Sequence, residues 1–251
     1  MRYCTLVAAA GFFLSASSLS FAAPVVFFGE DVNNAGDPNQ APFTNATNAR
    51  NTFFGNLTGV GTETFESYSS TPSTLSFPGA GNAALSGNAA LQSGNDGFGR
   101  YPFSGTQYLT LDTSSFTVTF SNPGGIAAFG FYATDIGDFG AHLTLTLTDL
   151  NNVTTVLTVN NTLGSGGSTS GSNFYYGFYD TTTTYKQIVF NSDSIAAGDD
   201  VFGFDDLSVG SLEQVTPNST TPVPAALPLF ASGLGAFGYF GWRRKRKATA
   251  A

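Results

Sequence analysis

Residues 143–148 read Leu-Thr-Leu-Thr-Leu-Thr, a strict alternation of apolar and polar side chains. Because successive side chains of a β-strand point to opposite faces, this period of two predicts a strand with one buried face. Asp149 to Asn152 supplies turn-forming residues, and residues 154–159 follow them. We therefore expect the two segments to form an antiparallel hairpin.

The same kind of pattern recurs through the middle of the chain, with turn residues between the segments. Strands are expected at 62–68, 75–77, 84–85, 108–112, 116–120, 126–133, 174–179, 186–190 and 202–209. Strands at this spacing with almost no helix predict an all-β, antiparallel β-sandwich. We favour a jelly roll over an immunoglobulin-like sandwich, because residues 69–99 form a long insertion and no Cys/Trp pattern between sheets is present.

One segment has helical spacing. Between residues 42 and 57, apolar side chains fall on one face, with Thr44 as the expected N-cap and Gly55 near the end. The apolar face consists of Ala46, Ala49, Phe53 and Leu57. The sequence therefore predicts one short helix near the start of the β-domain.

The first 22 residues have the features of a secretory signal peptide. Arg2 provides a positive charge, an apolar run extends from Leu6 to Leu14, and Ser20-Phe21-Ala22 forms a small-x-small cleavage site. A buried N-terminal helix is the alternative, but such a helix would show a polar and an apolar face. We expect cleavage between Ala22 and Ala23. Cys4 is the only cysteine and precedes this site, so the processed chain would have no disulfide.

The C-terminal end combines an uncharged apolar segment with a basic cluster. Residues 225–242 contain no charged side chain and are long enough to cross a bilayer once. Basic residues remain on the cytoplasmic side of a membrane, so we expect the basic cluster to stop transfer of the chain at the end of this segment. A lasting membrane anchor is one interpretation of this end. The basic cluster is Arg243, Arg244, Lys245, Arg246 and Lys247.

The order of these features resembles the PEP-CTERM class of bacterial sorting tails, in its variant with a V-P-x-P-A motif. Pro222, Val223, Pro224 and Ala225 match the last four positions, whereas Thr221 stands where the motif has its first valine. The resemblance covers residues 222–251. It implies recognition by an exosortase-type membrane protease, transient anchoring in the inner membrane and delivery to the cell surface or extracellular matrix.

These ends leave a body of residues 23–211, followed by a polar linker at 212–221. All 17 acidic residues but only three of the nine basic ones, Arg50, Arg100 and Lys186, lie between the two terminal signals. A nucleic-acid partner requires a basic footprint, so the composition excludes that class. It favours cations as partners.

Residues for common catalytic sites are scarce in the body. It contains one histidine, His142, and no cysteine, so a Ser/Cys–His triad or a zinc site is not expected. We therefore expect no enzymatic activity. The alternative is a glycan-active enzyme that uses a carboxylate pair. Its candidates are Glu63, Glu66, Asp135, Asp138, Asp199, Asp200, Asp205 and Asp206.

Calcium is a second use for such acids, because it binds carboxylates and carbonyls on loops. Phe65-Glu66 near the start and residues 204–209, Phe-Asp-Asp-Leu-Ser-Val, at the end resemble the extracellular jelly-roll domains of the MAM and carbohydrate-binding-module type. The resemblance implies adjacent first and last strands and a structural calcium held by Glu66 with Asp205 or Asp206. Asp135 and Asp138 form a second candidate metal loop.

The aromatic segment 174–179 bears on ligand binding. Alternation places Tyr175 and Tyr179 on one face and Phe174, Tyr176 and Phe178 on the other, so one set is core and the other is either a sugar-binding face or a covered one. Together, the sequence predicts an exported surface or matrix protein that is structural or binds exopolysaccharide.

Overall fold

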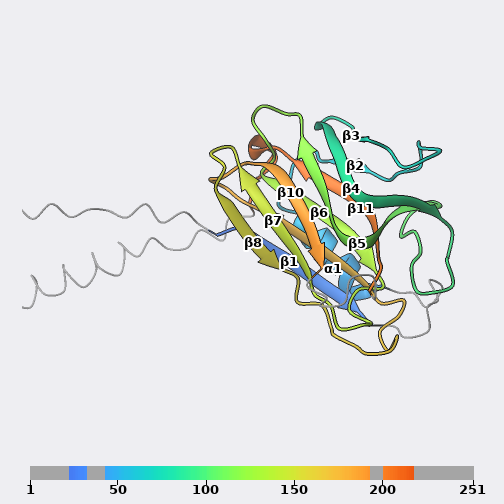
Figure 1. The fold of residues 1–251 in the computed structure, drawn as a ribbon. Helices are drawn as coiled ribbons and strands as arrows, with labels where there is room; N and C mark the ends of the chain where they lie inside the picture. Colours follow the sequence, from blue (N-terminus) through green and yellow to red (C-terminus); the bar gives the residue numbers. More distant parts are fainter. Residues whose placement is uncertain (1–22, 33–42, 193–199, 218–251) are drawn as a thin grey trace, which may run out of the picture.

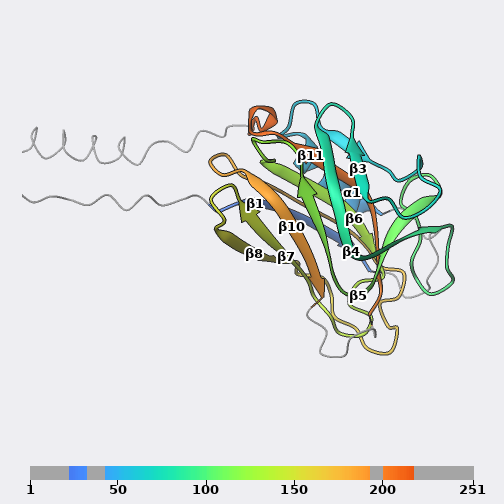
Figure 2. The same ribbon diagram turned by 45° about the horizontal axis from the view of Figure 1, so that its top comes forward.

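The computed structural model describes residues 23–32, 43–192 and 200–217. Their elements form one curled antiparallel sheet with a single short α-helix on its outer side, as Figures 1 and 2 show. The elements are β1 (Val25–Asp31), α1 (Thr44–Phe54), β2 (Gly61–Glu63), β3 (Thr74–Phe77), β4 (Gly81–Ser93), β5 (Gln107–Phe120), β6 (Ala128–Thr134), β7 (Leu143–Asp149), β8 (Thr154–Thr158), β9 (Asn173–Tyr179), β10 (Tyr185–Ser192), β11 (Phe202–Gly210) and the 3₁₀ helix η1 (Leu212–Gln214).

The strand order is β1-β9-β6-β11-β5-β10-β7-β8, with β2 beside β11, and β3 and β4 continuing beyond β5. β5 joins two halves, because residues 109–111 pair with β11 and residues 115–119 pair with β10. The sheet curls so that β6 faces β10, with the rings of Phe131 and Phe190 5.2 Å apart. The expected antiparallel, mostly β fold with one short helix is confirmed, and the jelly-roll assignment stays a prediction.

The core lies between the two halves and is rich in phenylalanine. The ring of Phe116 stacks on Phe190 at 4.3 Å and meets Phe204 edge-on at 5.3 Å. Aromatic pairs in these arrangements add to the free energy gained by burying their apolar area. The alternating leucines of β7 are buried and its threonines face outward, as the sequence predicts.

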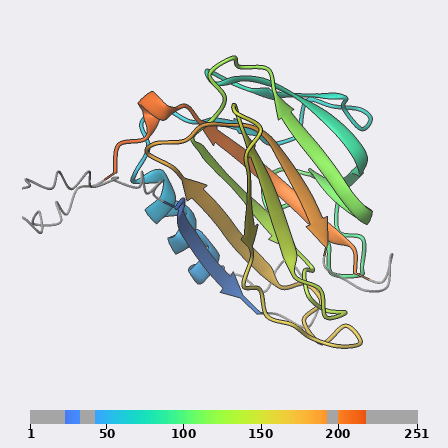
Figure 3. The same cartoon turned by 60° about the vertical axis from the view of Figure 1, so that its left-hand side comes forward.

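α1 covers the outer face of the β1-β9-β6 half, as Figure 3 shows. The N-cap of the helix is Phe43 and not the expected Thr44, which is the first helical residue. The carboxylate of Asp31 on β1 accepts hydrogen bonds from the backbone amides of Asn45 and Ala46 at 3.0 and 2.9 Å. A carboxylate at this position satisfies free amides and interacts favourably with the helix dipole.

Two segments differ from the sequence-based prediction in extent. The expected strand at 62–68 ends at Glu63, because Phe65 adopts a positive φ of 63° that a strand does not permit. The body also continues past the expected boundary at 211, since Val215 pairs with Leu57 and the amide of Thr216 bonds to the carbonyl of Asn56.

Among the described residues, no helix is long and apolar enough to cross a membrane. The predicted signal peptide and sorting tail, 222–251, lie outside the described residues.

Candidate functional site

The β4–β5 connection presents an aromatic ring on a tightly held loop, here called the Phe98 loop (residues 94–106). The Asp96 carboxylate accepts hydrogen bonds from the amides of Phe98 and Arg100 at 2.8 and 3.2 Å, and it pairs with the guanidinium of Arg100. Gly97 and Gly99 have φ values of +79° and +111°, which glycine adopts without strain. The turn is thus fixed from within by one carboxylate.

The β8–β9 connection contacts the backbone of the same loop and holds it in place. The Ser170 hydroxyl donates to the carbonyl of Phe98 at 2.9 Å. A Cβ at Gly99 would lie 2.6 Å from the amide nitrogen of Gly171, so the two backbones are in close contact. The Phe98 side chain is nevertheless 72% exposed, the largest value among the exposed large apolar side chains of the described residues. A rigid backbone therefore holds an apolar ring in solvent.

A depression of 310 Å³ adjoins this ring. The guanidinium of Arg100 lies 6.0 Å from the Phe98 ring centroid, within reach of a cation–π contact. An exposed ring can stack on the apolar face of a sugar, while guanidinium, amide and hydroxyl groups bond to its hydroxyls. The lining residues are Ala90, Gln92, Asp96, Phe98, Arg100, Thr110 and Val201.

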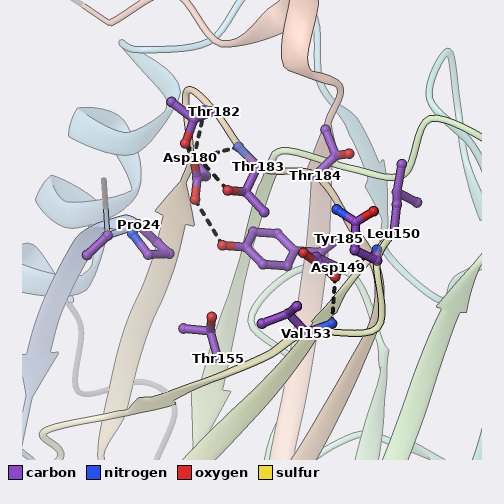
Figure 4. Close-up of a pocket in the computed structure, with 12 residues that line it drawn as sticks. Pro24, Asp149, Leu150, Val153, Thr155, Asp180, Thr182, Thr183, Thr184 and Tyr185 are labelled. Atoms are coloured by element: carbon purple, nitrogen blue, oxygen red, sulfur yellow. Dashed lines mark hydrogen bonds between the residues drawn. The ribbon is translucent and has the colours of Figure 1, made fainter. Parts of the chain in front are cut away.

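A larger pocket of 480 Å³ lies between the β7–β8 and β9–β10 turns (Figure 4). Its carboxylates hold those turns. Asp180 accepts hydrogen bonds from the amides of Thr182 and Thr183, both at 2.8 Å, and from the Tyr185 hydroxyl at 2.9 Å. Asp149 likewise accepts from the amide of Val153 at 2.7 Å. Since Tyr185 is buried, this pocket offers no exposed ring for stacking.

The structure brings the three predicted calcium ligands to one place, beneath the end of the Phe98 loop. β2 pairs with β11, so the segments carrying Glu66 and Asp205 meet. Glu66 accepts hydrogen bonds from the amides of Thr106 and Gln107 at 2.8 and 2.7 Å. Asp205 accepts from two further amides, of Phe103 and Ser104, both at 2.8 Å. These carboxylates hold the loop through its backbone.

Asp206 completes this group with a bond from the Ser104 hydroxyl at 2.6 Å. Burial raises the pKa of Asp205 to about 8, and the charge of Asp206 adds to the rise. Burial also raises the pKa of Asp206 itself. The hydrogen bonds show that the lone pairs of these side chains are directed at the protein backbone and Ser104.

The second predicted metal loop, which contains Asp135 and Asp138, lies close to Asp200. The sequence suggested Asp200 only as a candidate catalytic acid. Asp135 and Asp138 are buried in the β6–β7 connection, and Asp200 approaches them from the start of β11. Burial raises the pKa of Asp135 to about 8 and that of Asp200 to about 7, and in both cases the charge of Asp138 raises it further. Within the described residues, no set of three or more Asp, Glu, His or Cys side chains has the arrangement of a metal site.

The remaining catalytic candidates have other environments. Glu63 is buried and accepts hydrogen bonds from the amides of Phe65 and Ser76 at 2.8 Å each, so it organises the protein interior. Asp199 lies outside the described residues. The alternation in β9 places both aromatic sets in cores: Phe174, Tyr176 and Phe178 face the main core, while Tyr175 and Tyr179 lie under α1. Both faces of β9 are therefore covered, and neither is a sugar-binding face.

The Phe98 ring was not singled out by sequence reasoning. The segment Asn95-Asp96-Gly97-Phe98-Gly99 holds the signal, since Asn, Asp and Gly mark a turn and an aromatic residue between two glycines has no strand neighbour to pack against. Its exposure depends on contacts with residues about 70 positions later, which no local pattern shows.

No protein-family model matches this sequence, and no curated protein matches it. Solved structures show distant similarity. The K2 cleaved adhesin domain of Lys-gingipain is 16% identical with a TM-score of 0.39, covering 60% of this chain and 97% of that one. The C-terminal family 22 carbohydrate binding module of Clostridium thermocellum Xyn10B is 14% identical with a TM-score of 0.36, covering 64% and 96%. TmCBM61, solved with beta-1,4-galactotriose, is 16% identical with a TM-score of 0.31, covering 51% and 88%.

Proposed function

We propose that this chain is a non-catalytic glycan-binding protein of the cell surface or extracellular matrix, and that the Phe98 loop is its binding site. The observation that carries the proposal is a phenyl ring held in solvent at 72% exposure by a turn whose backbone is fixed from within by Asp96 and from below by Ser170. Single exposed apolar residues are common on protein surfaces. A preorganised one beside a polar depression is typical of recognition.

The chemistry of the depression suits a neutral polysaccharide. Arg100 is the only basic residue in its lining, and it is paired with Asp96, so the site has no free positive charge for an acidic sugar. Gln92, Arg100 and Thr110 provide donors and acceptors beside the ring. Stacking from Phe98 and hydrogen bonds from these groups would orient one sugar unit of an exopolysaccharide.

Replacing Phe98 with alanine is expected to weaken polysaccharide binding by about tenfold or more, because truncating a central aromatic contact typically costs at least 1–2 kcal/mol. The measurement is affinity electrophoresis or retention of the purified protein on exopolysaccharide from the producing cells and on xylan and β-1,4-galactan. Phe98→Tyr retains the ring and should retain binding. Val153→Ala removes a distant exposed apolar side chain, 62% exposed, and should leave binding unchanged.

Two results would reject this assignment. Retention of the wild-type protein on none of the tested polysaccharides would reject glycan binding. Equal retention of the wild-type and Phe98→Ala proteins would reject the Phe98 loop as the site.

We further propose export through the predicted signal peptide, followed by transient anchoring through residues 222–251 and processing by an exosortase-type protease. The support is the order of the Pro222–Ala225 motif, the apolar segment and the Arg243-Arg244 cluster. Mass spectrometry of the protein from its native cell is expected to show a chain that begins at Ala23 and lacks the basic end. A protein that retains residues 243–247 would instead favour the lasting-anchor interpretation.

A further inference from the structure

Three carboxylates lie buried together at the end of the curled sheet beside the Phe98 loop. Asp135 and Asp138 are each 4% exposed, and Asp200 is 7% exposed. The carboxylate of Asp200 accepts the amides of Gly137 and Ala141, which lie on either side of Asp138 in the chain. The charges of Asp138 and Asp200 raise the pKa of Asp135, and the charge of Asp138 raises that of Asp200. The group thus joins the β6–β7 connection to the segment that enters β11.

The basic residue that acts on two of these acids is already paired with another acid. Arg100 is the basic residue that acts on Asp135 and Asp138, yet its guanidinium is paired with Asp96. One oxygen of Asp200 accepts the amides of Gly137 and Ala141 at 3.1 and 3.4 Å. Buried carboxylates without a compensating charge are costly, so folded proteins pair them with a cation or protonate them.

One carboxylate oxygen of this group is buried without a partner. Oδ1 of Asp200 has no hydrogen-bond partner although its residue is more than nine-tenths buried. Buried polar atoms are normally satisfied by protein, water or an ion, so this oxygen indicates a polar occupant.

We propose that Asp138 and Asp200 bind a divalent cation of the calcium type, with Asp135 adding negative charge beside them. The donors are oxygen atoms without histidine or cysteine, which favours Ca²⁺ over zinc. Ca²⁺ accepts six to eight oxygens in flexible geometry. Two carboxylates therefore suffice when loop carbonyls and water complete the shell.

Through Asp135 the acidic group contacts the segment that holds the Phe98 loop, and this part of the inference rests on the proposed function. The amide of Gly171 donates to Asp135 at 3.2 Å, and the carbonyl of Gly171 accepts the Tyr101 hydroxyl at 3.0 Å. Ser170 in turn holds the carbonyl of Phe98. A cation that fixes the acidic group would therefore also fix the base of the Phe98 loop and strengthen glycan binding.

Thermal melting of the purified protein in CaCl₂ and in EDTA tests the cation site without any glycan. A ligand that binds only the folded state raises Tm, so Ca²⁺ at a hundredfold excess over its Kd should raise Tm by about 5–10 °C. Asp138→Asn/Asp200→Asn should abolish this rise. In EDTA the same variant should melt at or above the wild-type temperature, because two uncompensated buried charges are gone.

Glu66→Gln is the matched control, since Glu66 belongs to the other candidate group and should keep the calcium response. An unchanged wild-type Tm in millimolar CaCl₂ would overturn the proposal. A response lost in Glu66→Gln but kept in Asp138→Asn/Asp200→Asn would also overturn it and place the ion near Asp205. If the double variant does not fold, calorimetric titration of Asp200→Asn with CaCl₂ replaces it, and wild-type affinity there would contradict the assignment.

The two proposals fail separately. A calcium response without polysaccharide retention would leave the cation site standing and reject the glycan site. Retention that depends on Phe98 but is equal in CaCl₂ and EDTA would reject the coupling between the two sites.

Discussion

Replacing Glu63 with alanine is expected to lower the free energy of unfolding by about 3–5 kcal/mol, because each buried donor left unsatisfied costs about 1–3 kcal/mol. The Glu63 side chain is 5% exposed and lies at the end of β2. Its two oxygens accept the amides of Phe65 and Ser76, both at 2.8 Å, and the Tyr68 hydroxyl at 2.7 Å. Alanine would leave the two amides without an acceptor, whereas the Tyr68 hydroxyl could still donate to the carbonyl of Thr74 at 3.1 Å.

The position of Glu63 explains why the effect should be large. Phe65 has a positive φ of 63°, an unfavourable conformation for a bulky residue, and the bond from its amide to Glu63 holds the chain there. Ser76 lies on β3, so the same carboxylate joins β2 to a second strand. Burial and the bond to Glu63 raise the pKa of Tyr68 to about 12, so Tyr68 remains a neutral donor at physiological pH.

Urea unfolding monitored by tyrosine fluorescence or circular dichroism measures this difference. Glu63→Gln is the matched control, because its amide oxygen retains one acceptor position and should cost about half as much. Glu213→Ala replaces an exposed acid and should change the free energy of unfolding by less than about 0.5 kcal/mol. If Glu63→Ala unfolds at the wild-type urea concentration, Glu63 does not hold this network.

Sequence patterns predicted most strands of the sheet, but missed β1 and gave β4 too short. β7 alternates and was predicted to within one residue. β1, Val-Val-Phe-Phe-Gly-Glu-Asp, was not predicted, because its apolar residues are consecutive and it is covered on one side by α1. β4 was predicted only as a short strand, since its many Gly, Ala and Asn residues have low strand propensity, and its extent is set by pairing with β5.

The candidate site shows the same limit in a different form. Acid-rich loops could be recognised in the sequence, but which acids meet depends on the curl of the sheet. Asp200 lies beside Asp138 although 62 positions separate them, while Glu63 turned out to serve the backbone. The sequence identifies each acidic side chain, but only the fold determines whether its carboxylate faces an amide, another carboxylate or solvent.

Replacing Gly29 with alanine is expected to destabilise the protein by about 3 kcal/mol, although glycine-to-alanine changes at compatible positions are stabilising. Gly29 lies on β1 where α1 crosses it. A Cβ there would lie 2.1 Å from the carbonyl oxygen of Asn45 and 3.0 Å from the Cβ of Ala49. Helix backbone cannot turn aside as a flexible side chain can, so α1 must move away from the sheet.

Moving α1 would uncover the small core between the helix and the sheet. There the ring of Phe53 on α1 packs against that of Tyr175 on β9, with 5.9 Å between the ring centroids. The buried hydroxyl of Tyr175 has no hydrogen-bond partner, so its ring is held in this layer by packing. Gly124→Ala is the matched control, since its φ is not positive and its nearest added contact is an ordinary 3.6 Å from Asn122. We expect Gly124→Ala to melt within about 2 °C of the wild type and Gly29→Ala to melt several degrees lower. Equal melting of the two variants would mean that α1 does not lie this close to β1.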